Sequence, residues 1–127
     1  MAEKTKILIA DDEESLRVLL KAVMASEENF EFAEAIDGDD ALIKVKQDKP
    51  DILILDVMMP GQSGFEVCEA IKADDNLKDI KVIILTAKGQ DSDKEWADSV
   101  GADYFLSKPF SPLELLELLK QISQKTV

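Results

Sequence analysis

Short apolar runs alternate along the chain with longer segments in which apolar residues recur every three or four positions. Three of the runs, at 7–10, 52–55 and 82–85, are continuous, and each stops at a polar residue. Such runs are typical of strands that are buried on both faces of a sheet. Two more strands are predicted at 30–35 and 104–106. Polar residues interrupt the run at 30–35, which favours the edge of the sheet for that strand.

The segments of helical period lie between and after these strands. Apolar residues at helical spacing predict helices around 16–23, 41–45, 65–71, 96–100 and 115–122. Strands and helices in alternation predict an α/β fold, in which a parallel sheet carries helices on both faces. The strand order 2-1-3-4-5 places the polar second strand at an edge. We therefore predict a five-stranded, doubly wound, flavodoxin-like sheet with five helices.

Length and composition narrow the possible functions. The 127 residues predict a single domain over 1–127. The net charge of -12 repels nucleic acid phosphates, so direct nucleic acid binding is not expected. With no histidine and one cysteine, the chain has no Ser-His-Asp or Cys-His catalysis and no imidazole metal site. No apolar run approaches the ~20 residues of a membrane span, and no signal-peptide core is present, so we expect a cytoplasmic setting.

Polar residues directly follow the predicted strands. Asp11 and Asp12 follow the first strand and Asp56 follows the third. Thr86 follows the fourth strand and Lys108 the fifth. Doubly wound folds bind ligands outside the carboxyl ends of their strands, at the point where the strand order reverses. We therefore expect three carboxylates, a hydroxyl and an ammonium group to converge there.

This group of side chains suits phosphoryl transfer. Three carboxylates packed together repel one another unless a cation lies between them, and Mg2+ commonly bridges carboxylates to a phosphate. Asp56 would act as the nucleophile at phosphorus and form an aspartyl phosphate. Lys108 would pair with one phosphoryl oxygen and Thr86 would donate a hydrogen bond to another. Phosphoryl transfer needs mainly positioning and charge neutralisation, which these residues supply.

Each residue also has a plainer interpretation when it is taken alone. Asp12 could be a helix N-cap, and Asp56 could be a turn residue. Thr86 could be an ordinary strand former and Lys108 a surface lysine. Their combination at the strand ends favours the site. Cys68 lies at helical spacing among apolar residues, so we expect it in the core.

The combined motif resembles the signature of the response-regulator receiver domain of bacterial two-component systems. The likeness covers about residues 4–122 and rests on Asp11-Asp12, Asp56, Thr86 and Lys108-Pro109 within the contexts 54–60 and 101–110. It implies a signalling switch, and not an enzyme with a separate substrate. It implies that a histidine kinase or a histidine phosphotransfer protein donates the phosphoryl group to Asp56.

The resemblance also implies how the metal is held. Asp12 would bind Mg2+ directly, with Mn2+ as a substitute, and Asp11 would help through water. Asp56 and the main-chain carbonyl of Met58 would complete the protein ligands. Met58 has no amide or carboxylate to orient an attacking water, so we expect slow self-dephosphorylation.

The switch itself is implied by the same resemblance. Thr86 would move toward the phosphoryl group and Phe105 would turn inward. These movements would reshape the surface of the fourth helix, the fifth strand and the fifth helix, which a downstream protein or a second copy of the chain would bind.

Tyr104 should point to the opposite face of the sheet from Phe105. On the fifth helix, Leu113 on the polar side and Leu116 at the margin of the apolar side suggest part of a partner or dimer surface.

Three other classes fit less well. A magnesium-dependent phosphohydrolase would need a DxD pattern after the first strand, and Glu13 stands at its third position. A flavin-binding module of the same topology would need a Ser/Thr/Gly-rich phosphate loop there, where the acidic residues would repel a phosphate. A degenerate receiver used only for protein contacts would not need all five site residues.

Overall fold

The protein is described here by a computed structural model, which covers residues 4–25, 27–57, 63–87, 101–108 and 111–125. Strands and helices alternate as predicted, and their bounds are β1 Thr5–Ala10, α1 Glu14–Met24, β2 Phe30–Ala35, α2 Gly38–Asp48, β3 Ile52–Asp56, α3 Gly64–Ala73, β4 Lys81–Ala87, β5 Tyr104–Lys108 and α5 Pro112–Lys125. The helix predicted around 96–100 lies outside the described residues.

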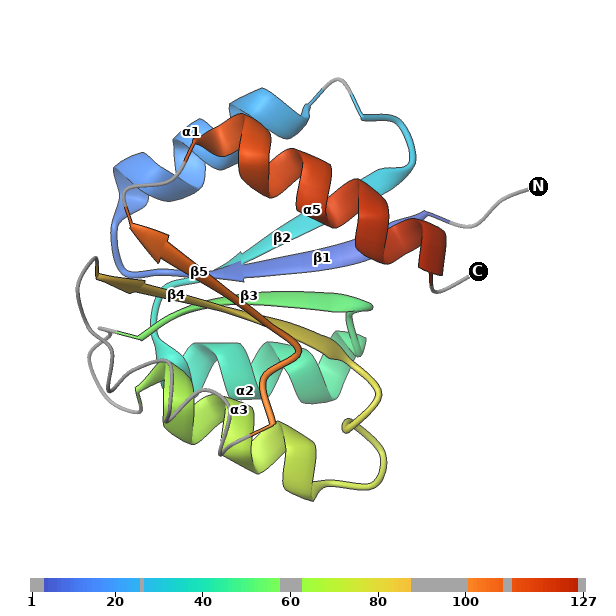
Figure 1. The fold of residues 1–127 in the computed structure, drawn as a ribbon. Coiled ribbons are helices and arrows are strands. Elements are labelled where there is room, and N and C mark those ends of the chain that lie inside the picture. Colours follow the sequence, from blue (N-terminus) through green and yellow to red (C-terminus); the bar gives the residue numbers. More distant parts are fainter. Residues whose placement is uncertain (1–3, 26, 58–62, 88–100, 109–110, 126–127) are drawn as a thin grey trace.

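All five strands are parallel and follow the order β2-β1-β3-β4-β5, which confirms the predicted topology. Helices α1 and α5 cover one face of the sheet, and α2 and α3 cover the other (Figure 1). Among the described strands, the polar strand β2 pairs with β1 alone and lies at an edge, as its pattern indicated. No helix in the described part of the chain combines the length and the hydrophobicity that crossing a bilayer requires.

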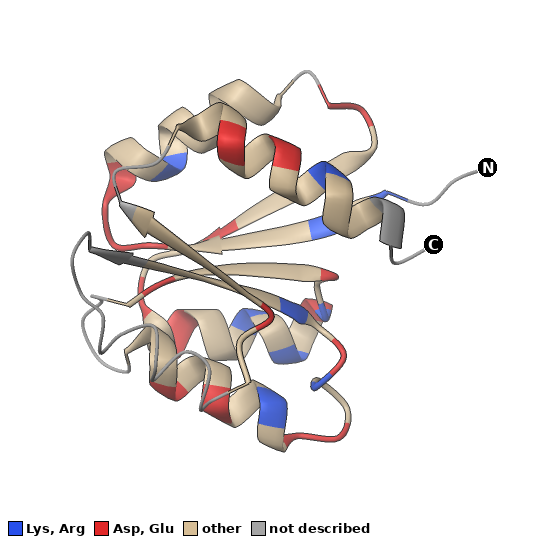
Figure 2. Cartoon of the chain, viewed as in Figure 1, with Lys and Arg blue, Asp and Glu red and all other residues tan. Residues whose placement is uncertain are grey.

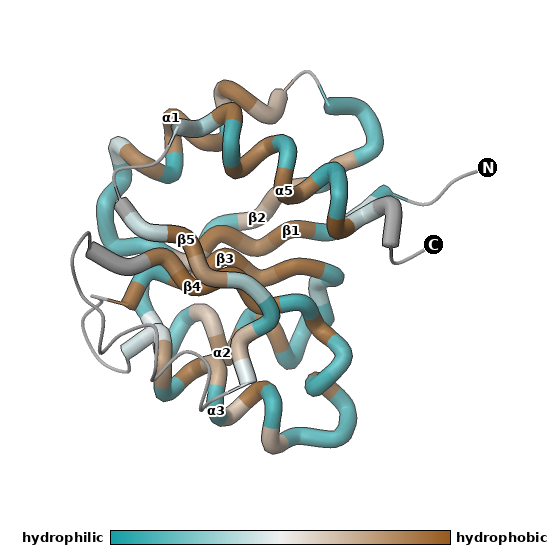
Figure 3. Tube along the Cα trace, viewed as in Figure 1, coloured by the Kyte–Doolittle hydropathy of each residue, from teal (hydrophilic) through white to brown (hydrophobic). Residues whose placement is uncertain are grey.

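The core consists of two apolar layers, one on each face of the sheet. Along β1, Leu8 belongs to the layer beneath α2 and α3, whereas Ile7 and Ile9 belong to the layer beneath α1 and α5. Because successive side chains of a strand point to opposite faces, a strand between two layers must be apolar throughout. The sheet is accordingly the most hydrophobic part of the molecule (Figure 3).

The structure confirms the positions that strand alternation and helical period predicted for three side chains. Phe105 packs against the layer beneath α2 and α3, and Tyr104 packs against the other layer, as expected. Cys68 is fully buried in α3, which confirms its core position. Burial raises the pKa of the Cys68 thiol to about 11.

Two leucines depart from the predicted helix faces. The spacing of Leu16, Leu19, Leu20 and Val23 predicts that these four residues share the buried face of α1. Leu19 is instead 47% exposed, and the buried positions of this helix are Leu20 and Met24. Leu116 was expected at the margin of α5, but it is only 8% exposed, whereas Leu113 is 65% exposed. Helix α5 packs against α1 as well as on the sheet, so its buried arc is wider than one sheet contact would need. Only Leu113 of the two suggested surface leucines is available to a partner.

Candidate functional site

The predicted carboxylates meet at the carboxyl end of two neighbouring strands. Ala10 of β1 pairs with Leu55 of β3, so the next residues, Asp11 and Asp56, lie beside each other. Asp11, Asp12 and Asp56 each place a carboxylate oxygen within 4.8 Å of the others. Figure 2 shows acidic residues along the whole connection from β1 to α1, at this edge of the sheet. The three carboxylates of the predicted group therefore meet in the fold.

Burial makes this cluster costly without a cation. Asp11 is fully buried and Asp56 is 4% exposed, while Asp12 is exposed. Buried carboxylates at short range repel one another, and a positive ion relieves that repulsion. The donors are all oxygen atoms, which is the set that hard divalent cations prefer. Two oxygen atoms bound directly to one Mg2+ ion lie at most about 4.2 Å apart, because each lies about 2.1 Å from the metal. The three carboxylate oxygens lie within 4.8 Å of one another, so a small movement or a water bridging Asp11 to the ion lets them share it.

Local hydrogen bonds shape the loop that carries two of these acids. Asp11 accepts a hydrogen bond at Oδ1 from the main-chain N–H of Glu13, at 2.9 Å. Helix α1 begins at Glu14 and its N-cap position falls on Glu13. The alternative interpretation of Asp12 as the N-cap of this helix is therefore wrong.

Asp56 is held against the start of α3. Gly64, the first residue of α3, donates a main-chain hydrogen bond to the carbonyl oxygen of Val57 at 3.2 Å. A Cβ atom at Gly64 would lie 3.0 Å from the carbonyl carbon of Asp56 and 3.1 Å from Cα of Val57, and it would meet the Asp56 carbonyl oxygen most closely. A glycine here lets α3 touch the end of β3. The capping box of Ser63 and Glu66 determines where the helix begins.

Strand register places the main chain of Thr86 and Lys108 at the same edge of the sheet. The main chain of Asp56 pairs with Leu85, one residue before Thr86, and Lys108 pairs with Ala87 at the ends of β4 and β5. Each of the strands β3, β4 and β5 includes its polar end residue and runs one to three residues further than the apolar runs predicted. Ladder hydrogen bonds involve the main chain alone, so polar side chains do not end the pairing. Met58 lies outside the described residues.

Sequence reasoning overlooked one side chain that contacts this loop. Arg17 of α1 donates from Nη1 to the main-chain carbonyl oxygen of Asp11 at 2.6 Å, and from Nε to Glu34 of β2 at 3.1 Å. The sequence does contain a signal for this contact, because Arg17 lies between the apolar positions Leu16 and Leu20. A guanidinium group that close to the buried face of a helix needs hydrogen-bond acceptors.

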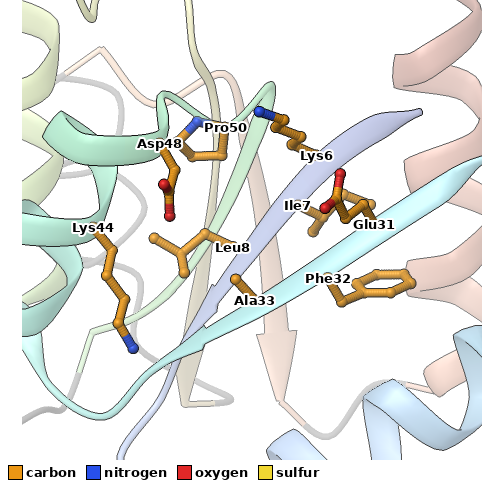
Figure 4. A pocket seen from close by; sticks show the side chains of 9 residues that line it. All are labelled: Lys6, Ile7, Leu8, Glu31, Phe32, Ala33, Lys44, Asp48 and Pro50. Atoms are coloured by element: carbon orange, nitrogen blue, oxygen red, sulfur yellow. The ribbon is translucent and has the colours of Figure 1, made fainter. Parts of the chain in front are cut away.

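A hollow of about 170 Å³ lies against β1, β2 and α2, and neither Asp11, Asp12 nor Asp56 lines it. In Figure 4, Lys44 and Asp48 project from α2, and Leu8 and Ala33 point from the sheet toward the same space. None of the nine side chains that line the hollow is a predicted site residue. The strand-end cluster therefore remains the candidate site.

Doubly wound sheets bind ligands outside the carboxyl ends of their strands, at the point where the strand order reverses, and the acid cluster lies at that point, after the neighbouring strands β1 and β3. Among known families, the model described as the response regulator receiver domain matches residues 7–120. The chain belongs to this family, the receiver domains of two-component systems, which act in phosphorylation-dependent signalling.

Individual relatives agree with this assignment. The chain is 41% identical to the phosphate regulon transcriptional regulatory protein PhoB of Pseudomonas aeruginosa, over 99% of this chain and 54% of that protein. It is 37% identical to the alkaline phosphatase synthesis transcriptional regulatory protein PhoP of Bacillus subtilis, over 95% of this chain and 49% of that protein. The chain thus spans about half the length of these curated relatives.

Solved structures show the same fold. The receiver domain of the Francisella response regulator 1452 has a TM-score of 0.88 at 28% identity, covering 98% of this chain and all of that one. The chemotaxis protein CheY4 of Vibrio cholerae has a TM-score of 0.85 at 32% identity, covering 94% of this chain and 98% of that one.

Proposed function

We propose that Asp56 accepts a phosphoryl group from a phosphohistidine on a histidine kinase or a histidine phosphotransfer protein. A carboxylate oxygen of Asp56 forms the new P–O bond while the P–N bond of the donor breaks. The donor's imidazole ring, which carries a proton on its other nitrogen, leaves as neutral imidazole with the electron pair of the broken bond. Because the imidazole nitrogen is a good leaving group and the nucleophile is already anionic, the step needs no general base from this chain. This suits a chain without histidine.

Asp11, Asp12 and Asp56, with the main-chain carbonyl of Met58, are the proposed ligands of Mg2+. When bound, the ion neutralises the cluster and screens the incoming phosphoryl group. Asp56 then presents one oxygen for attack. Lys108 pairs with a phosphoryl oxygen as a point charge, and Thr86 donates a hydrogen bond to another.

The proposed output is a change of surface. Thr86 moves toward the phosphoryl group and Phe105 turns into the space that it leaves, which alters the surface of the segment before β5, of β5 and of α5. The half-buried position of Phe105, at the rim of one core layer, supports this role. The altered surface binds a downstream protein or a second copy of the chain. We also propose slow loss of the phosphoryl group, because Met58 offers no polar group to attacking water.

The observation that carries the proposal is the short distance between the three carboxylates at the ends of β1 and β3. Intact-protein mass spectrometry after incubation with a small phosphodonor tests it directly. We expect one phosphoryl adduct that requires both Mg2+ and Asp56, and no adduct on Asp56→Asn. Asp51→Asn is the matched control, because Asp51 precedes β3 at the opposite end of the same strand. An adduct on Asp56→Asn, or none on folded wild-type protein, would contradict the proposal.

A further inference from the structure

One side chain of α1 joins the acidic loop to the edge strand of the sheet. Arg17 holds the carbonyl oxygen of Asp11 with Nη1 at 2.6 Å and the carboxylate of Glu34 with Nε at 3.1 Å. The Arg17 side chain is 12% exposed, so the guanidinium is largely screened from water. Hydrogen bonds from a charged donor in such surroundings are stronger than neutral ones.

The acceptor on the far side is itself held in place. Glu34 accepts a second hydrogen bond, at 2.9 Å, from Nζ of Lys21, and Lys44 donates to its main-chain carbonyl oxygen. The hydrogen bond from Lys21, followed by that from Arg17, lowers the pKa of Glu34 although burial works in the other direction. Glu34 therefore stays ionised near neutral pH and gives the guanidinium of Arg17 a fixed partner on β2.

The Arg17 contact acts on the peptide group that joins the two acids of the loop. The carbonyl of Asp11 and the N–H of Asp12 belong to one planar unit. The N–H of Asp11 donates to the carbonyl oxygen of Ala35 at 3.2 Å, so the main chain is held on both sides of Asp11. Holding that carbonyl determines the direction in which the chain leaves Asp11, and hence where the carboxylate of Asp12 lies.

We propose that Arg17 is a positioning residue for the metal site, because it holds the Asp11–Asp12 peptide and keeps the Asp12 carboxylate within reach of Asp11 and Asp56. This inference rests on the proposed function, since it takes the acid cluster to bind Mg2+. Arg17 touches neither the metal nor the phosphoryl group in this role. It acts through the main chain of the loop.

The charge of Arg17 and its hold on the loop predict opposite changes in metal affinity when Arg17 is replaced, which makes the inference testable. A cation beside an acid cluster repels a divalent ion, so removing its charge alone should tighten metal binding. Losing the hold on the loop should weaken metal binding instead. Loss of a partner that orients a metal ligand typically reduces metal affinity by roughly 10- to 100-fold.

The experiment measures Mn2+ binding by the electron paramagnetic resonance signal of the free ion, with Mg2+ as competitor. Arg17→Met and Lys21→Met are a matched pair, because each removes one positive charge and one ion pair to Glu34. Only Arg17→Met also removes the contact with Asp11. We expect about tenfold weaker metal binding in Arg17→Met and unchanged or tighter metal binding in Lys21→Met. In the metal-free proteins Arg17→Met should lose more thermal stability than Lys21→Met, because it also loses the hydrogen bond to Asp11.

Arg17→Lys provides the second test, and the deciding one if Arg17→Met does not fold. An ammonium group keeps the charge but cannot reproduce the fork that reaches Asp11 and Glu34 together. We expect an affinity between those of wild type and Arg17→Met. Wild-type affinity in Arg17→Lys, or equal or tighter binding in a folded Arg17→Met, would overturn the inference while leaving the proposed function intact. A wild-type protein that binds neither Mn2+ nor Mg2+ would contradict both the inference about Arg17 and the proposed function.

Discussion

Replacement of Gly64 by alanine perturbs the contact between α3 and the end of β3. The added methyl group would lie 3.0 Å from the carbonyl carbon of Asp56 and 3.1 Å from Cα of Val57. Both atoms belong to main chain that is buried and paired in the sheet, so neither can move aside as a flexible side chain would. The overlap must be relieved by a shift of α3 or of the residue that carries the Asp56 carboxylate.

Two effects of opposite sign determine the magnitude. Alanine is favoured over glycine within a helix by about 1 kcal/mol, whereas overpacking a close contact costs about 1–3 kcal/mol. The contact is with main chain, so we place the cost near the upper part of that range and expect a net loss of about 1–2 kcal/mol in the free energy of unfolding. For 127 residues the unfolding entropy is about 0.27 kcal/mol per degree, so Tm should fall by about 4–8 °C.

The assay is urea unfolding followed by far-ultraviolet circular dichroism, with the rate of phosphoryl adduct formation measured beside it. Ala70→Gly, at an exposed position of the same helix, isolates helix propensity and should cost about 1 kcal/mol. If propensity alone mattered, Gly64→Ala would be stabilising by a similar amount. A Gly64→Ala protein as stable as wild type, or more stable, would refute the steric reasoning.

Two further predictions concern the shifted pKa values. The pKa of Glu34 is lower in the native state than its ordinary value of 4.5, so the ionised carboxylate stabilises the native state at pH values above 4.5. This contribution disappears as the pH falls through the native pKa. The difference in unfolding free energy between wild type and Glu34→Gln, roughly 0.2–1 kcal/mol for each ion pair, should therefore be present at pH 7. In urea titrations it should decrease once the pH falls below 4.5 and disappear as the pH passes through the lowered native pKa. The raised pKa of Cys68, about 11, keeps the thiol protonated, so iodoacetamide at pH 8 should leave folded protein unmodified and alkylate it fully in urea; rapid alkylation of the folded protein would contradict its burial.

The sequence was most informative where one physical rule acts alone. Continuous apolar strands must lie between two layers, and polar residues at their ends must meet at one edge, so the fold and the grouping of Asp11, Asp12 and Asp56 could be predicted. Leu19 and Leu116 were misplaced because helical period identifies an apolar face but not how many neighbours cover it. Arg17 was overlooked because a lone arginine is usually solvated, and its two acceptors lie on other segments.

The position of Asp56 in the sheet has a mechanical consequence. Strand β3 is paired on both sides and is buried along its entire length, whereas β5 pairs with β4 alone among the described strands. Close-packed interiors compress little and pass strain onward. The carboxylate of Asp56 is thus carried by the most constrained strand, and the strands at the edges of the sheet are less constrained. A force that acts on Asp56 would therefore displace β3 less readily than it would displace the edge strands β2 and β5 of the described sheet.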